Sequence, residues 1–179
     1  MLEALITSKT RIKLMLKFFL DSNSKGYLRG LESEFGESSN AIRLELNRFE
    51  AAGLLLSFSE GNRKIYHANQ FHPLFRDISN LVRTYVGMDE IIERIINHLG
   101  QPQEVYLLGD LANGLDSSIV SLLIIAEEID LEYLEQLCIK AQKMIKRNIR
   151  YVVFSKEEFM QRLPSYDKEK KLLIWKNTN

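Results

Sequence analysis

The sequence predicts an α+β protein whose N-terminal part is mainly helical and ends in a β-hairpin, and whose C-terminal part alternates strands with helices. Two patterns point to this class. Apolar residues recur at helical spacing over the first fifty residues or so, and two strand-like runs joined by a glycine turn follow at 54–68. From residue 103 onward, short apolar runs of strand length alternate with amphipathic stretches that are long enough for helices.

The composition indicates a globular protein. Of its 179 residues, 45% are hydrophobic, which is enough for a core, and 24 Lys and Arg balance 24 Asp and Glu. The whole-chain charge therefore gives no argument for a polyanionic partner. The apolar run at 119–126 is too short to span a bilayer, and the first residues, MLEALITSKTRIK, lack the pattern of a signal peptide. We expect a soluble, cytoplasmic protein with no membrane partner.

The N-terminal part begins with an amphipathic helix over residues 8–21. The segment SNSKG breaks this helix, and YLR then forms a short extended piece. The stretch GLESEFG forms a short helix that is bounded by its two glycines, Gly30 and Gly36. The apolar face of the first helix consists of Ile12, Met15, Leu16 and Phe19.

A third helix is predicted over ESSNAIRLELNRFEAAG. Ser38 or Ser39 caps its start, because a serine side chain can accept a hydrogen bond from the first N–H groups of a helix. Gly53 ends the helix, since glycine tolerates the left-handed conformation that often follows a helical C-terminus. Its apolar face consists of Ile42, Leu46 and Phe49.

Two strand-like runs, LLLSFS and RKIYHA, follow this helix and are joined by the turn EGN. Helix, short strand, helix, helix and hairpin is the order of a winged helix-turn-helix domain. In such a domain the last helix, here 38–52, is the recognition helix, which enters the major groove of DNA. The hairpin tip, here 59–65, is the wing and suits the DNA backbone.

The outer face of the predicted recognition helix supports DNA binding. Arg43 can make a bidentate contact to guanine, and Asn40 or Asn47 can do so to adenine. The serines at the helix start can bind a phosphate, and the two cations of the wing suit the backbone beside the groove. The predicted DNA-binding residues are Ser38, Ser39, Asn40, Arg43, Asn47, Arg63 and Lys64.

An ordinary solvated helix face and a winged helix that binds protein are the alternatives. Residues 1–70 contain only slightly more Lys and Arg than Asp and Glu, which is weak electrostatic support for DNA binding. The polar stripe, the hairpin and its basic tip nevertheless occur together in the order that a DNA-binding domain requires. This coincidence favours DNA over the alternatives.

Residues 7–75 resemble the ArsR-like winged-helix regulators that carry a nucleotidyltransferase-like domain after the DNA-binding module. The similar pieces are SKTRIKLM, SSNAIRLELNRFEAAGLL and GNRKIYHANQFHPLF. The order of the downstream parts is similar as well. The resemblance implies a cytoplasmic, dimeric transcription factor that binds double-stranded DNA. Its parts are a winged-helix domain (1–72), a helical linker (73–100) and a degenerate nucleotidyltransferase-like domain (101–179).

Two predicted helices occupy the linker. Apolar residues at helical spacing run through PLFRDISNLVRTYV and, after Gly87, through MDEIIERIINHL. These helices have more apolar surface than a linker needs. They form either a dimer seam, which would set two recognition helices about 34 Å apart on DNA, or an ordinary packing surface for the neighbouring domains.

The C-terminal part has the element order of a small nucleotidyltransferase core. A helix capped by Asp130 lies between its second and third strands, and SKEEFMQRL opens with a capping box from Ser155 to Glu158. The apolar run at 172–175 is expected to dock on a core. The strands are EVYLLGD, IVSLLII and IRYVVFS.

Active members of the nucleotidyltransferase superfamily carry a Gly-Ser pair and then, after a loop, an Asp-x-Asp on the next strand. The glycine lets backbone N–H groups approach the triphosphate, the serine binds a phosphate, and the carboxylates hold the metal ions. The stretch YLLGDLANGLDSS keeps two glycines, Gly109 and Gly114. It has Asp110 in place of the serine, which puts a negative charge where a triphosphate would lie.

The metal-binding carboxylates are missing as well. When the next strand is aligned with the family pattern, Ser118 and Val120 take the metal-ligand positions. We therefore expect no catalytic residue, no metal and no cofactor, and a domain that serves dimerisation or binds a small-molecule or nucleotide effector. A diverged metal-dependent nucleotidyltransferase that uses Asp110 and Asp116 is the enzymatic alternative. The vestigial nucleotide site consists of Gly109, Asp110, Gly114, Asp116 and Ser118.

Cysteine and histidine give no site. Cys138, the only cysteine of the sequence, lies at helical spacing among apolar residues and is expected in a core rather than as a nucleophile. His67, His72 and His98 are isolated and lack the spacing of zinc ligands.

Overall fold

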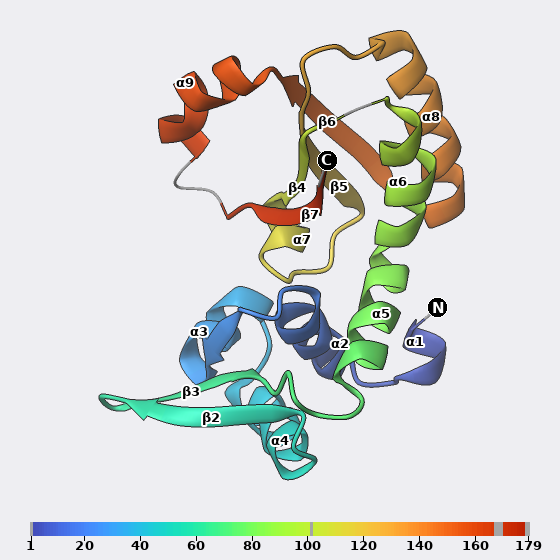
Figure 1. Cartoon of the computed structure of the whole chain (residues 1–179). Coiled ribbons are helices and arrows are strands. Elements are labelled where there is room, and N and C mark those ends of the chain that lie inside the picture. Colours follow the sequence, from blue (N-terminus) through green and yellow to red (C-terminus); the bar gives the residue numbers. More distant parts are fainter. Residues whose placement is uncertain (1, 101, 167–169, 178–179) are drawn as a thin grey trace. The chain divides into compact units, whose positions relative to one another are not determined.

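The computed structural model describes residues 2–100, 102–166 and 170–177. These residues form an α+β protein, as the sequence predicts (Figure 1). They divide into two compact units. Unit 1 holds the residues up to Tyr85 together with Gly114–Asp116, and unit 2 holds Val86–Asn113 and the residues from Ser117 onward. None of the helices described combines the length and the apolar character that crossing a bilayer requires.

Unit 1 contains the helices that the N-terminal periodicity predicts. The predicted apolar face of the first helix is buried, with at most 7% of any of its side chains exposed. This helix is α-helical to Met15 and continues as a π-helical turn over Leu16–Leu20. The helices of unit 1 are α1 (Leu2–Leu5), α2 (Lys9–Met15), α3 (Leu28–Phe35) and α4 (Ser39–Ala51), and α5 (Phe75–Val86) begins in this unit.

The sheet of unit 1 has the strand order β1-β3-β2, and all its pairs are antiparallel. Its strands are β1 (Lys25–Tyr27), β2 (Leu55–Glu60) and β3 (Arg63–Ala68). The extended piece predicted at YLR is thus wrong by two residues, because Leu28 and Arg29 already belong to α3. Gly30 lies inside α3 rather than at its start, and Gly36, with φ 62°, ends the helix as predicted. Pairing with β3, a long-range contact, fixes where β1 lies.

The ends of α4 are closed by local hydrogen bonds. Ser38 Oγ accepts a hydrogen bond from Ala41 N at 3.2 Å, so Ser38 rather than Ser39 is the N-cap. At the other end Gly53 has φ 71°, and Leu54 N donates to Phe49 O at 2.9 Å. These bonds satisfy backbone groups that a helix leaves unpaired, and the chain then turns into β2.

Unit 2 is built on a mixed sheet with the strand order β6-β5-β4-β7. Its elements are α6 (Met88–Arg94), β4 (Glu104–Leu108), α7 (Gly109–Ala112), β5 (Ile119–Ile125), α8 (Leu131–Ile145), β6 (Asn148–Phe154), α9 (Lys156–Tyr166) and β7 (Leu172–Lys176). β5 and β6 are parallel and α8 connects them, whereas β4 pairs antiparallel with β5 and with β7. The run 172–175 docks as part of this edge strand, where Trp175 pairs with Val105.

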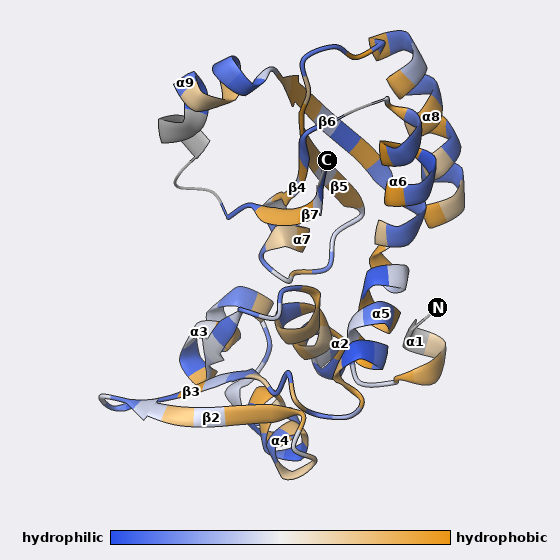
Figure 2. Ribbon diagram, viewed as in Figure 1, coloured by the Kyte–Doolittle hydropathy of each residue, from blue (hydrophilic) through white to orange (hydrophobic). Residues whose placement is uncertain are grey.

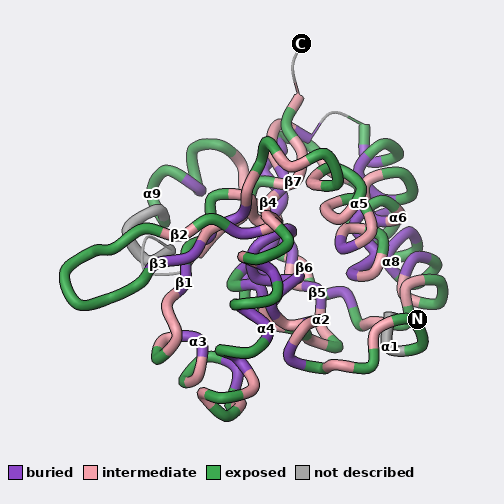
Figure 3. The backbone as a smooth tube through the Cα atoms, turned by 90° about the horizontal axis from the view of Figure 1, so that it is seen from below, coloured by how far each residue is buried: buried purple, intermediate pink, exposed green. Residues whose placement is uncertain are grey.

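The strands of unit 2 provide much of its core. Apolar residues follow β4 and β5 in Figure 2, and Figure 3 shows buried residues concentrated in these strands. On one face of the sheet, Phe159 of α9 packs with Leu123 and Ile125 of β5. Cys138 of α8 is 3% exposed, and burial followed by the charge of Glu135 raises its pKa to about 11. This confirms the core position predicted for the cysteine.

The helix caps predicted for unit 2 are confirmed. Asp130 Oδ1 accepts a hydrogen bond from Tyr133 N at 3.0 Å. Ser155 and Glu158 form a reciprocal capping box, in which each side chain accepts a hydrogen bond from the backbone N–H of the other, at 3.1 and 2.9 Å.

Candidate nucleic-acid interface

α4 has one face held by the protein and one face open to solvent. Ile42, Leu46 and Phe49 are 0%, 1% and 7% exposed. The ring of Phe49 meets that of Phe19 edge to face, with centroids 6.5 Å apart. The predicted base-reading residues on the opposite side are exposed, and these are Asn40, Arg43 and Asn47.

The predicted base-reading side chains are also unpaired. Within residues 2–100, 102–166 and 170–177, Asn40, Arg43 and Asn47 make no side-chain hydrogen bond, ion pair or ring contact. Arg48, on the same helix, behaves differently, because its Nη1 donates to Glu45 at 3.0 Å. The outer face of α4 therefore offers donors and acceptors that the protein itself does not use.

A buried carboxylate joins α4 to α2. Glu45 is 4% exposed and accepts hydrogen bonds from Ser8 Oγ at 3.1 Å, from Arg11 Nε at 2.9 Å and from Arg48. Burial alone would raise the pKa of Glu45, but the hydrogen bonds from Arg11 and Ser8 and the two arginine charges outweigh it, so the pKa is lowered. The carboxylate is thus ionised at neutral pH, and its bonds fix the orientation of α4. No role was predicted for Glu45 from the sequence.

The N-terminal end of α4 is suited to an anion. Ser38 uses an Oγ lone pair to cap the helix, so its hydroxyl proton can still be donated to a ligand. Ser39 is half-buried in the first turn. Helix N-termini also carry a partial positive charge from the aligned peptide dipoles. A backbone phosphate is the ligand that this combination favours.

The two cations predicted for the hairpin tip point to opposite faces of the sheet, as neighbours on a strand do. The guanidinium of Arg63 lies over the ring of Tyr27, 4.6 Å from its centroid. Lys64 Nζ instead donates to Glu50 of α4 at 2.7 Å. This hydrogen bond lowers the pKa of Glu50 and raises the pKa of Lys64. The charge of Lys64 is therefore already matched by a carboxylate, while Arg63 has no such partner among the described residues.

The residues predicted for the vestigial nucleotide site do not form one group. Gly109 opens α7 with φ 67°, and Asp110 is exposed on the same short helix. Gly114 and Asp116 belong to unit 1, where Asp116 accepts a hydrogen bond from the Tyr85 hydroxyl at 2.9 Å. The described residues contain no group of three or more His, Cys, Asp or Glu that could hold a metal ion.

The alignment that gave Ser118 and Val120 the metal-ligand positions is off by one residue. A Cβ added at Gly109 would lie 3.8 Å from Ser121 Oγ, so Ser121 is on the face of β5 next to the glycine turn. Side chains alternate along a strand, and Val120, which is 1% exposed, therefore faces the other way. Ser118 lies on that other side too, where it lines a pocket with residues of α8. Ser121 and Ile119, which take the positions instead, are not carboxylates either.

Comparisons with known proteins do not assign this arrangement to a family. No protein-family model matches the chain, and no curated protein matches it. The function is therefore inferred from the contacts described above.

Proposed function

We propose that the chain is a transcriptional regulator that binds double-stranded DNA through a winged helix-turn-helix domain. The order α2, β1, α3, α4, β2, β3 is that of such a domain, with residues 36–38 as the turn between its two central helices. The observation that carries the proposal is the outer face of α4. There the side chains of Asn40, Arg43 and Asn47 are exposed and have no partner within the described residues.

In this proposal α4 lies in the major groove. Arg43 binds guanine through two parallel hydrogen bonds, and Asn40 or Asn47 binds adenine in the same way. Ser38 and the N-terminal end of α4 bind a backbone phosphate, and Arg63 binds a phosphate beside the groove. Base reading requires a fixed helix orientation, which the buried network around Glu45 supplies.

Unit 2 acts in this proposal as a non-catalytic nucleotidyltransferase-like domain. The order β4, α7, β5, α8, β6 is that of the core named above, and Gly109 holds the turn after its first strand. Asp110 and Ser121 stand where a hydroxyl and a carboxylate would be needed for phosphate and metal binding. Because DNA half-sites are usually read by symmetric pairs of domains, we expect a homodimer.

Substituting Arg43 by alanine tests the DNA interface. Selection from a random duplex library would supply the preferred site, and fluorescence anisotropy at a fixed salt concentration would then measure Kd. Arg43→Ala should weaken binding about tenfold and relax the preference at one base position, because a bidentate base contact is lost.

Arg150→Ala is the control for this substitution. Arg150 is an exposed arginine of β6 in unit 2 whose side chain has no polar partner in the part of the chain that the structure describes. Its substitution should leave both Kd and base preference unchanged. Enrichment of no duplex in the selection, or equal losses in both variants, would contradict the proposal.

Substituting Glu50 by glutamine should strengthen DNA binding about threefold, since an exposed ion pair of this kind is weak and its removal releases the cation. Lys64, now held by Glu50 at 2.7 Å, would become available to a backbone phosphate. The dependence of log Kd on log salt concentration should steepen by about one ion. Glu128→Gln, a change of an exposed carboxylate in unit 2, should do neither. Weaker binding by Glu50→Gln would place Lys64 outside the interface.

A further inference from the structure

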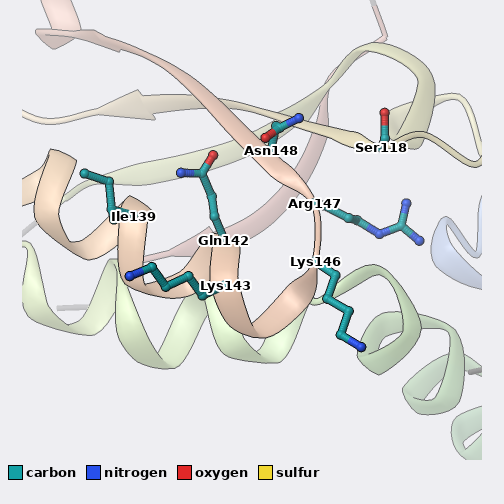
Figure 4. A pocket seen from close by; sticks show the side chains of 7 residues that line it. All are labelled: Ser118, Ile139, Gln142, Lys143, Lys146, Arg147 and Asn148. Atoms are coloured by element: carbon teal, nitrogen blue, oxygen red, sulfur yellow. The ribbon is translucent and has the colours of Figure 1, made fainter.

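Unit 2 contains a pocket of about 320 Å³ where α8 ends and β6 begins (Figure 4). Pockets of this size accept small molecules. The polar residues that line it are Ser118, Gln142, Lys143, Lys146, Arg147 and Asn148. None of the described lining residues is acidic, so the pocket offers hydrogen-bond donors and positive charge without a neutralising carboxylate.

The middle of the pocket is held by backbone contacts. Gln142 Oε1 accepts a hydrogen bond from Ile149 N at 2.8 Å, which leaves the NH₂ group of the amide as a donor. Asn148 N donates to Ser118 O at 2.8 Å and keeps the two residues side by side. Figure 4 shows Gln142 reaching from α8 toward Asn148. Two amides and a hydroxyl thus form a fixed polar floor.

The cationic side chains surround this floor. Arg147 donates to the backbone oxygen of Ser117. The side chains of Lys143 and Lys146 have no hydrogen-bond or ion-pair partner within the described ranges. Figure 4 shows the three cations leaving the rim in different directions, and the flexible lysine stems allow their ammonium groups to turn toward a bound anion.

The backbone at Lys146 is unusual for a lysine. It caps α8 in the left-handed conformation, with φ 55° and ψ 35°, and it is the one residue other than glycine with a positive φ among those described. Glycine is the usual residue at this position of a helix because it has no Cβ to strain. A lysine here suggests that its side chain has a use that offsets the strain.

We propose that this pocket binds a small molecule that carries at least two negative charges on phosphate groups. Cations and amide and hydroxyl donors line its polar part without any carboxylate, which fits phosphate oxygens, and Ile139 adds an exposed apolar surface for an organic moiety. Binding does not depend on the DNA interface. Only the role of the ligand as an effector of DNA binding rests on the function proposed above.

The cations of the pocket have two alternative roles, which make different predictions. Positive side chains near the C-terminal end of a helix are favourable by themselves, because the helix dipole is negative there. A nucleic-acid backbone is also a partner for such a surface. The first role predicts no binding of a free anion, and the second predicts that the lysines contribute to the affinity for duplex DNA.

Titration calorimetry of the full chain with inorganic pyrophosphate and with ADP tests the proposal. We expect saturable binding with one ligand per chain. Lys146→Gly should weaken it about tenfold, because a charged hydrogen bond is lost, while the melting temperature stays constant or rises by about 2 °C as strain is relieved. Lys143→Gln should weaken it as well. Lys140→Gln, on the same helix but outside the pocket lining, should not.

Three results would overturn the proposal. The first is the absence of saturable heat with either ligand at millimolar concentration. The second is an equal loss in Lys140→Gln, which would mean that only the net charge of α8 matters. The third is weaker duplex binding by Lys146→Gly without any pyrophosphate binding, which would assign the surface to DNA. Arg43→Ala should bind pyrophosphate as the wild type does, so the two proposals can fail separately.

Discussion

Replacing Gly87 with alanine should destabilise unit 2 by about 3 kcal/mol. Gly87 precedes α6 with φ 85°, a conformation that alanine adopts at a cost of about 1 kcal/mol or more. An added Cβ would also lie 2.6 Å from Ile145 Cγ2 and 2.8 Å from Ile145 Cβ. A rotamer change cannot move the Cβ of Ile145, so the end of α8 would have to shift, and overpacking of this kind adds about 1–3 kcal/mol.

Urea denaturation followed by the thiol reactivity of Cys138 would measure this loss. Cys138 is the only cysteine of the sequence, and it is buried in α8, so its reaction reports the unfolding of unit 2. Gly100→Ala is the control. Gly100 has a similar φ of 88° in the same unit, but no described atom lies within 4 Å of its added Cβ. Its substitution should destabilise by about 1 kcal/mol, from backbone strain alone. Equal effects of the two changes would show that contact with Ile145 contributes nothing.

Much of the fold could be predicted because its signals are local. The apolar spacing located α2, α4 and α8, and the caps at Ser38 and Asp130 follow from short-range chemistry. The errors arose where the decisive contact is distant. The position of β1 depends on its pairing with β3, in which Lys25 faces His67. Neither residue carries a local signal for that pairing.

The candidate interface was predictable in part for the same reason. Helical periodicity places Arg43 on the outer face of α4 and also places Glu45 on the buried stripe with Ile42. A carboxylate on a buried stripe was therefore a visible signal. Its meaning depends on Arg11, which lies 34 residues away and could not be assigned as a partner from spacing.

Charge assignments at the hairpin show a further limit. Lys64 has the sequence context of a phosphate-binding cation, but its pairing with Glu50 becomes visible only when the hairpin is placed beside α4. The one-residue shift on β5 has a related cause, since motif letters could be aligned in two ways. The proximity of Gly109 to Ser121 decides between them.

Replacing Glu45 with glutamine should lower the free energy of unfolding by about 2 kcal/mol at pH 7, because charged hydrogen bonds are lost. The carboxylate is 4% exposed, and glutamine would turn an NH₂ group toward donors of Ser8 and Arg11. Chemical denaturation followed by circular dichroism would measure the change. Glu37→Gln is the control, since Glu37 pairs with Lys13 at 2.7 Å but is more exposed. It should lose about 0.5 kcal/mol, the value typical of exposed pairs.

The pH dependence of stability gives a second measurement of the same carboxylate. The folded protein holds the pKa of Glu45 below the ordinary value of 4.5, so at acidic pH this carboxyl binds fewer protons in the folded state than in the unfolded chain. Its contribution is therefore complete above about pH 4.5 and is lost as the pH falls through the lowered pKa. Glu45→Gln has no proton to gain, so its stability should fall less steeply over that acidic range. Parallel pH profiles for the two proteins would mean that Glu45 is not the buried anion that joins α4 to α2.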